Sequence, residues 1–293
     1  MNYSAVKQDP SPDISTLLTG FPAISLDATN RRAKMLTRID NKYAVTFDQF
    51  RSLLKCISDD YSILEIDGLR QFSYSSCYYD DNFGCYFEHH QGRRQRMKVR
   101  TREYVDSGLR FFEVKLKGLR GKTNKYRTDC DFLVTPSIRS HFSEMLNSVY
   151  QKQYKKAMPF ALSPVLMINY QRCTLVARQG SERVTIDFSL CFDQPEGMSD
   201  PVHISNQFII VETKSDNGKG ITDRAMKKLN IRKASKCSKY CIGVNLMGKV
   251  RKNNNFLHMI KHVKQNIIPP GRSYPIHGHV PEPVTSKLCV VQS

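Results

Sequence analysis

A run of basic residues, RRQRMKVRTREY at positions 93–104, carries the strongest chemical signal in this sequence. Side chains alternate between the two faces of a β-strand, so on a strand five cations share one face: Arg94, Arg96, Lys98, Arg100 and Arg102. Same-face neighbours lie only about 7 Å apart, and a row of like charges at that spacing repels itself. The run therefore predicts a surface that faces an anion, or carboxylates of neighbouring strands.

Four other segments show the same alternation of charged and apolar faces. Their charged sides are Arg38, Asp40 and Lys42; Glu113, Lys115 and Lys117; Arg183 and Asp187; and Glu212 and Lys214. An antiparallel sheet with one face in water explains any one of these strands by solubility alone. If the strands instead close into a barrel with the charged faces inward, the lumen is a mainly basic channel that suits a chain of phosphates with its metal ions.

The overall charge indicates the same class of ligand. The 293 residues have a formal net charge of +18, which predicts an anionic partner such as a polyphosphate, a nucleotide, a nucleic acid or an acidic membrane surface. Charge alone does not choose among these partners.

Cysteine usage and hydropathy predict a cytoplasmic protein. Nine cysteines without a C-x-x-C pair, an odd number, fit a reducing compartment better than a disulfide framework. No stretch approaches the roughly 20 apolar residues of a membrane span, and the first residues lack the order of a secretion signal. Any attachment to a membrane would then depend on association with a membrane protein.

Alternating patterns rich in β-branched and aromatic residues predict about eight strands to position these charged faces. They lie at residues 37–45, 71–80, 84–90, 95–104, 110–117, 165–178, 182–190 and 207–214. Helices are predicted after Thr46 and Pro136 and near residues 222–230 and 256–265. We expect one domain over residues 31–267, between an extended lead-in (1–30) and a flexible tail rich in proline and glycine (268–293).

Seven short motifs, in a fixed order, resemble the VTC domain. They are R-x-D-x-K-Y (38–43), K-V-R-x-R-x-Y (98–104), F-F-E-V-K-x-K (111–117), Y-x-R (170–172), R-V-T-I-D (183–187), V-E-T-K (211–214) and S-K-Y (238–240). That domain is the catalytic module of the vacuolar transporter chaperone polyphosphate polymerases and also occurs as stand-alone bacterial proteins. It belongs to the triphosphate tunnel metalloenzyme, or CYTH-like, superfamily.

The resemblance implies an α+β fold in which about eight antiparallel strands close into a barrel, with flanking helices, around a tunnel that binds a triphosphate. The implied activity is transfer of the γ-phosphate of ATP to a growing inorganic polyphosphate chain, with release of ADP. The expected ligands are thus ATP and inorganic polyphosphate, with no specific nucleic acid.

The same motifs assign roles to individual residues. The implied phosphate ligands in catalysis are Lys42, Arg100, Arg102, Lys115, Arg172 and Lys239. Further cations would extend the basic path: Arg38, Arg94, Arg96, Lys98, Lys117 and Lys214. Glu212 is the implied ligand of Mn²⁺ or Mg²⁺, metals that suit carboxylate and phosphate oxygens. Glu113 and Asp187 are further candidates, either for the metal or for orienting basic side chains.

One departure from the superfamily pattern bears on the reaction. Hydrolytic members carry E-x-E-x-K on the first strand, where this sequence has Arg38, Asp40 and Lys42. An arginine in place of a carboxylate should weaken metal binding there, which favours transfer over hydrolysis. The alternatives are a metal-dependent triphosphatase on the same fold and a non-catalytic module that binds polyphosphate or RNA; the scarcity of aromatic residues near 93–104 counts against RNA.

Overall fold

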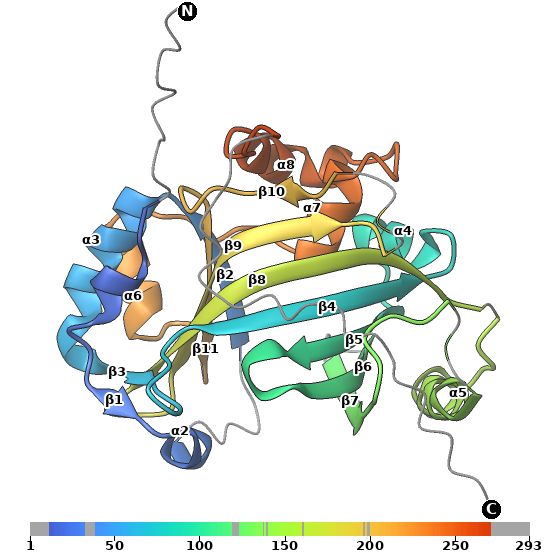
Figure 1. Ribbon diagram of the computed structural model, residues 1–293, viewed down its shortest axis with the longest axis horizontal. Helices are drawn as coiled ribbons and strands as arrows, with labels where there is room; N and C mark the ends of the chain where they lie inside the picture. The colour runs from blue at the N-terminus through green and yellow to red at the C-terminus, as the bar shows by residue number, and fades with distance from the viewer. Residues whose placement is uncertain are drawn as a thin grey trace, which may run out of the picture.

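The computed structural model describes residues 12–32, 39–118, 123–136, 138, 140–159, 161–195, 197 and 200–270. These residues form an α+β fold built on one strongly curled, mainly antiparallel sheet with helices on both faces (Figure 1). The main path through the sheet has the order β2-β11-β9-β8-β4-β5-β6-β7, and three short strands, β1, β3 and β10, are attached at its sides.

Seven of the eight strands of the main path lie close to predicted positions, and β7 was not predicted. They are β2 (Ile39–Val45), β4 (Phe72–Asp80), β5 (Arg96–Tyr104), β6 (Leu109–Lys117), β7 (Thr123–Asp129), β8 (Ser163–Ala177), β9 (Arg183–Asp193) and β11 (Ile209–Ser215). The short strands are β1 (Ala23–Ile24), β3 (Tyr61–Leu64) and β10 (Val202–His203).

Eight α-helices accompany the sheet in the described ranges. They are α1 (Ser15–Leu18), α2 (Leu26–Arg32), α3 (Phe47–Ile57), α4 (Gly84–Gln91), α5 (Ser140–Tyr154), α6 (Ile221–Lys228), α7 (Lys239–Leu246) and α8 (Leu257–Lys264). The start of α3 follows the sequence directly. Thr46 and Gln49 cap it reciprocally, because each side chain accepts a hydrogen bond from the other residue's backbone N–H.

Strand register gives the sheet one charged face and one apolar face. Lys42 pairs with Glu212, Arg172 pairs with Asp187, and Arg100 pairs with Glu113, so these side chains point to the same side. The alternate residues form the convex face, where α3 and α6 cover one half of the sheet and α5 covers the other (Figure 1). Burial of the apolar residues on the convex side leaves the charged residues on the concave side.

Three helices close one end of the concave face. Tyr240, Ile242 and Val244 of α7 pack against the sheet together with residues of α8. Tyr86 of α4 joins the same core. The Tyr240 and Tyr78 rings stack with their centroids 5.1 Å apart. The concave face is therefore filled at this end and accessible further along the strands.

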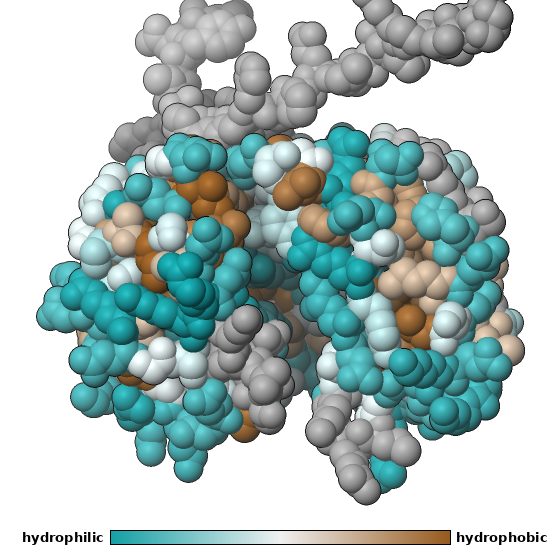
Figure 2. All heavy atoms as spheres, turned by 90° about the horizontal axis from the view of Figure 1, so that it is seen from below, coloured by the Kyte–Doolittle hydropathy of each residue, from teal (hydrophilic) through white to brown (hydrophobic). Residues whose placement is uncertain are grey.

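The sheet is open, which corrects the closed barrel expected from the sequence. In the described part of the chain, β2 and β7 stand at the two ends of the strand order and do not pair. The outer edge of β2 is engaged elsewhere, since the Ala234 N–H donates to the Lys42 carbonyl at 2.7 Å. A half-barrel results, and Figure 2 shows the groove that it leaves between two lobes, with hydrophilic residues along both rims.

Residues 84–90, predicted as a strand, form helix α4 instead. The carboxylate of Asp80 accepts hydrogen bonds from the backbone N–H groups of Cys85 at 2.8 Å and Tyr86 at 2.9 Å. A buried carboxylate that satisfies the first amides of a helix stabilises that helix over an extended strand. The aromatic pattern alone did not reveal this cap.

The predicted lead-in and tail are only partly described. Residues 12–32 include α1, β1 and α2, and Ile14, Leu18 and Phe21 are buried in the core, so this part of the lead-in is not simply extended. Residues 1–11 and 271–293 lie outside the described part. None of the described helices has the length and apolar content to cross a membrane.

Candidate functional site

Asp187 on β9 organises one group of cations on the concave face. Arg172 of β8 donates to both carboxylate oxygens, with N–O distances of 2.5 and 2.9 Å, and Lys239 of α7 bonds to the same carboxylate. The Asp187 side chain is fully buried. Both cations are thus fixed in position before any ligand binds.

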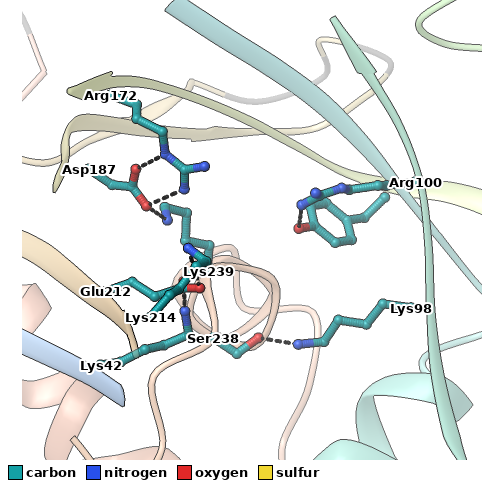
Figure 3. A network of polar contacts seen from close by, with 10 residues as sticks. Lys42, Lys98, Arg100, Arg172, Asp187, Glu212, Lys214, Ser238 and Lys239 are labelled. Carbon is teal, nitrogen blue, oxygen red and sulfur yellow. Dashed lines mark hydrogen bonds and ion pairs between the residues drawn. The ribbon is translucent and has the colours of Figure 1, made fainter. Parts of the chain in front are cut away.

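Glu212 on β11 holds two more cations beside this group. Lys42 of β2 pairs with one carboxylate oxygen, and Lys214 lies 3.0 Å from the other. Figure 3 shows these residues together with Arg172, Asp187 and Lys239 on one wall of the groove. Four strands and one helix therefore supply a single cluster of charged side chains.

Glu113 on β6 organises the opposite wall. Arg100 of β5 donates to one of its oxygens from two nitrogens at 2.7 and 2.5 Å, and Lys125 of β7 pairs with the other oxygen. Arg100 also donates to the Tyr78 hydroxyl at 2.8 Å. In Figure 3, Arg100 faces the first cluster across the groove.

Three further cations lie near Arg100 with no carboxylate partner in the described part of the chain. Arg102 donates to the Ser76 hydroxyl at 3.1 Å and lies over the rings of Tyr74 and Tyr170. Lys98 donates to the hydroxyl of Ser238 at 2.9 Å. Lys115 sits directly opposite Lys98 on the neighbouring strand.

The first turn of α7 lies between the two walls. Ser238 caps this helix, since its hydroxyl accepts a hydrogen bond from the Cys241 N–H while it also accepts from Lys98. Lys239, the next residue, extends to the other wall and bonds to Asp187 there. The positive end of the helix dipole adds to the potential between the walls.

Burial and mutual repulsion lower the pKa of three lysines. Burial and nearby cations lower the pKa of Lys42 and of Lys214 to about 7. Arg100, together with burial, lowers the pKa of Lys115 well below its usual range. An anion with several negative charges would offset this repulsion and restore full protonation.

Neighbouring cations instead favour the charged form of two carboxylates. Burial would raise the pKa of Asp187, but Arg172 and Lys239 hold it well below its usual range. Arg100 and Arg102 do the same for Glu113 against its burial. Nine basic residues thus line the groove together with three carboxylates: Lys42, Lys98, Arg100, Arg102, Lys115, Lys125, Arg172, Lys214 and Lys239. Such an excess of positive charge suits a highly charged anion.

The fit to Mg²⁺ or Mn²⁺ differs among the three predicted carboxylates. Glu113 and Asp187 are fully buried, and each is held by two cations. The Glu212 side chain is 14% exposed, between two lysines with lowered pKa. Magnesium sites commonly use one or two carboxylates with substrate phosphates, so Glu212 fits as a single protein ligand beside phosphate oxygens.

The structure brings most of the predicted site residues together. All six predicted catalytic cations lie on the two walls, as do Lys98 and Lys214. Arg96 and Lys117 lie opposite each other in the strand register, at the far ends of β5 and β6. Arg94 is exposed ahead of β5, and Arg38 lies outside the described residues.

Two contributors were missed at the sequence level. Lys125 lies on β7, a strand not predicted, although T-N-K-Y-R-T-D alternates charged and neutral residues and could have revealed it. Tyr78 lies on β4 outside the seven motifs, and its hydroxyl fixes Arg100 by accepting a hydrogen bond from it.

The fold places two basic walls on either side of one groove, and this geometry suits a polyanion. The VTC domain family model matches residues 37–248, and the chain belongs to this family. The resemblance drawn from the motifs is thereby confirmed. Among curated proteins, none matches the chain significantly.

Several solved structures are similar in part. An adenylyl cyclase candidate from Hippeastrum, described by its dominant triphosphatase activity, has 12% identity and a TM-score of 0.41, over 73% of this chain and 98% of that chain. A Pyrococcus furiosus protein has 10% identity and a TM-score of 0.38, over 70% and 99% of the two chains. The RNA triphosphatase of Schizosaccharomyces pombe has 10% identity and a TM-score of 0.27, over 69% and 80%.

Proposed function

We propose that this protein is an ATP-dependent polyphosphate polymerase, which transfers the γ-phosphate of ATP to a growing inorganic polyphosphate chain and releases ADP. The observation that carries the proposal is the pair of basic walls in one groove, each organised by a buried carboxylate. Membership of the VTC domain family supports it.

Phosphoryl transfer needs little covalent help from a protein. It requires alignment of the donor and acceptor phosphates, and cations around the transferred group. Arg100 and Arg172 offer planar guanidinium donors, and their ion pairs with Glu113 and Asp187 fix them beforehand. Donors fixed before binding need no reorganisation during the reaction, which is the main source of their effect on rate.

A divalent metal would complete this charge balance. Glu212 would hold Mn²⁺ or Mg²⁺ together with phosphate oxygens, and the ion would neutralise charge on the transferred group. Lys42 and Lys214 flank the same carboxylate, so they would contact the phosphates on either side of it.

The distribution of carboxylates favours transfer over hydrolysis. In the described residues, no group of three potential metal ligands lies in the groove, since the one such group is Asp80, Asp81 and Cys85. Each carboxylate of the groove is already paired with two cations. Such a site holds phosphate chains better than it activates water on a cluster of metals.

The test is to incubate the purified protein with ATP and Mn²⁺, separate the products on a gel stained for polyphosphate, and quantify ADP and orthophosphate. We expect long chains with a matching amount of ADP. Arg102→Ala should remove turnover. The matched control, Arg251→Ala at the exposed surface, should not.

Other outcomes assign a different function. Orthophosphate without chains, from ATP or tripolyphosphate, would identify a metal-dependent triphosphatase. If neither substrate turns over with Mn²⁺ or Mg²⁺, yet tripolyphosphate or RNA binds, the protein is a binding module.

A further inference from the structure

A second basic pocket lies outside the groove, between α6, the loop before it and the segment after it. Its volume is about 820 Å³. Tyr43 contributes to its lining, and this residue points to the convex side of β2, opposite to Lys42. The outer pocket, as we call it, is therefore separated from the groove by strand β2.

Five exposed cations surround the outer pocket: Lys219, Arg224, Lys227, Arg232 and Lys233. No ion pair joins any of them to a carboxylate in the described part of the chain. Backbone carbonyls orient two of them, because Arg224 donates to Lys219 at 2.9 Å and Lys233 donates to Gly218 at 3.2 Å.

The one acidic residue of the pocket is engaged by neutral donors and forms no ion pair with these cations. Asp223 is buried, and one of its oxygens accepts hydrogen bonds from Asn41 at 2.9 Å, the Tyr43 hydroxyl at 2.7 Å and Thr213 at 2.9 Å. Its other oxygen accepts from the Gly220 N–H at 3.1 Å. This carboxylate serves the wall of the pocket, and the five cations are left for a ligand.

A single segment of chain connects the outer pocket to the groove. Ile231, Arg232 and Lys233 line the pocket, and the Ala234 N–H then bonds to the carbonyl of Lys42 at the edge of β2. Four and five residues later, Ser238 and Lys239 lie in the groove. Eight steps of chain span at most about 29 Å, so one flexible anion could reach both sites.

We infer that the outer pocket is a second binding site for an oligophosphate. Five cations without carboxylate partners, two of them fixed by carbonyls, recognise several phosphates at once, and the volume exceeds the needs of one phosphate. Two sources have this chemistry: the polyphosphate chain as it leaves the groove over the edge of β2, which rests on the proposed function, and a separate oligophosphate that acts as an effector.

The experiment compares binding of tripolyphosphate and long-chain polyphosphate by titration calorimetry at one fixed salt concentration, without ATP. The variant is Lys227→Gln with Arg232→Gln, which removes two exposed charges of the outer pocket. The control is Lys228→Gln with Lys261→Gln, which removes two exposed charges elsewhere. The fixed salt matters because binding of polyanions depends steeply on it.

The two sources give different results. If the product chain occupies the pocket, the unmodified protein binds long chains at least about tenfold more tightly than tripolyphosphate, and only the pocket variant loses this gain. If a separate effector occupies the pocket, tripolyphosphate binds at two sites in the unmodified protein and at one site in the pocket variant. Long chains then bind no more tightly than tripolyphosphate. Equal stoichiometry and affinity in the pocket variant and the control would overturn the site.

This outcome is independent of the polymerase assay. Loss of one tripolyphosphate site in the pocket variant would support the outer pocket even in a protein that forms no polyphosphate. Conversely, turnover of ATP with no effect of the pocket variant on binding would leave the proposed function intact and remove the pocket.

Discussion

Arg172 and Asp187 face each other on adjacent strands and form a two-pronged ion pair, with N–O distances of 2.5 and 2.9 Å. Lys239 bonds to the same buried carboxylate from the first turn of α7. One aspartate thus joins the sheet to α7 and sets the positions of two cations. The arrangement implies that Asp187 supports both the fold and the affinity for phosphate.

We expect Asp187→Asn to lower the free energy of unfolding by about 3 kcal/mol, because it leaves two mostly buried cations without their counter-charge. Tripolyphosphate should recover much of this loss by replacing the missing charge. Urea unfolding, followed by circular dichroism with and without tripolyphosphate, measures both effects. Asp48→Asn, in an exposed pair on α3, is the control. Equal stabilisation by the ligand in both variants would contradict this role.

Arg100 should matter for its shape as well as its charge. Its guanidinium contacts both Glu113 and Tyr78, so Arg100→Lys would keep the charge but lose this geometry. We expect turnover to fall by about 10²–10³-fold for Arg100→Ala and by less for Arg100→Lys. Initial rates of ADP formation measure the effect, with Arg51→Ala on α3 as control. Full activity in Arg100→Ala would exclude this residue from the site.

The charged face of the sheet could be predicted because strand periodicity is local. The positions of Lys42, Arg100 and Glu212 on one face follow from alternation within their own strands, and the structure places them as the pattern predicts. What alternation cannot predict is which carboxylate pairs with which cation. The Asp187–Lys239 pair joins residues far apart in sequence and depends on how α7 packs into the curled sheet.

The errors have a similar physical origin. Residues 84–90 have a composition that suits a strand, and Asp80, outside that segment, makes them a helix by bonding to its first amides. In the open sheet, the Ala234 N–H occupies an edge of β2 that a closed barrel would need. The Asp80 contacts span only five and six residues, and the Ala234–Lys42 contact joins residues far apart in the chain. Both satisfy backbone groups, which composition and periodicity do not report.

The affinity for tripolyphosphate should fall as the pH rises through about 7. Burial lowers the pKa of Lys42 and Lys214 to about 7, and a lysine carries its charge only below its pKa, so the groove loses positive charge above that pH. Lys214→Arg keeps its charge at every pH in this range and should flatten the decline. Calorimetric titrations of both proteins from pH 6 to 9 test this, since the ligand's own ionisation is common to both. A parallel decline in the two would refute the assignment.

Binding above pH 7 should also take up protons. The phosphates favour the charged form of Lys42 and Lys214, so their pKa rises when the ligand binds. Titrations at pH 8 in two buffers of different ionisation enthalpy should give different apparent enthalpies. The Lys214→Arg variant should show a smaller difference between the two buffers.

Glu212→Gln separates the two roles of this carboxylate. It removes a charge with little change of shape, so Mn²⁺ should bind to the complex with tripolyphosphate about tenfold more weakly or worse. Without metal, the same change should leave tripolyphosphate affinity equal or higher, because Lys42 and Lys214 lose a competing carboxylate. Titrations with and without Mn²⁺ measure both, and Glu65→Gln, which pairs with Arg70 away from the groove, is the control. If the variant loses affinity equally in the two conditions, Glu212 orients the lysines and does not hold the metal.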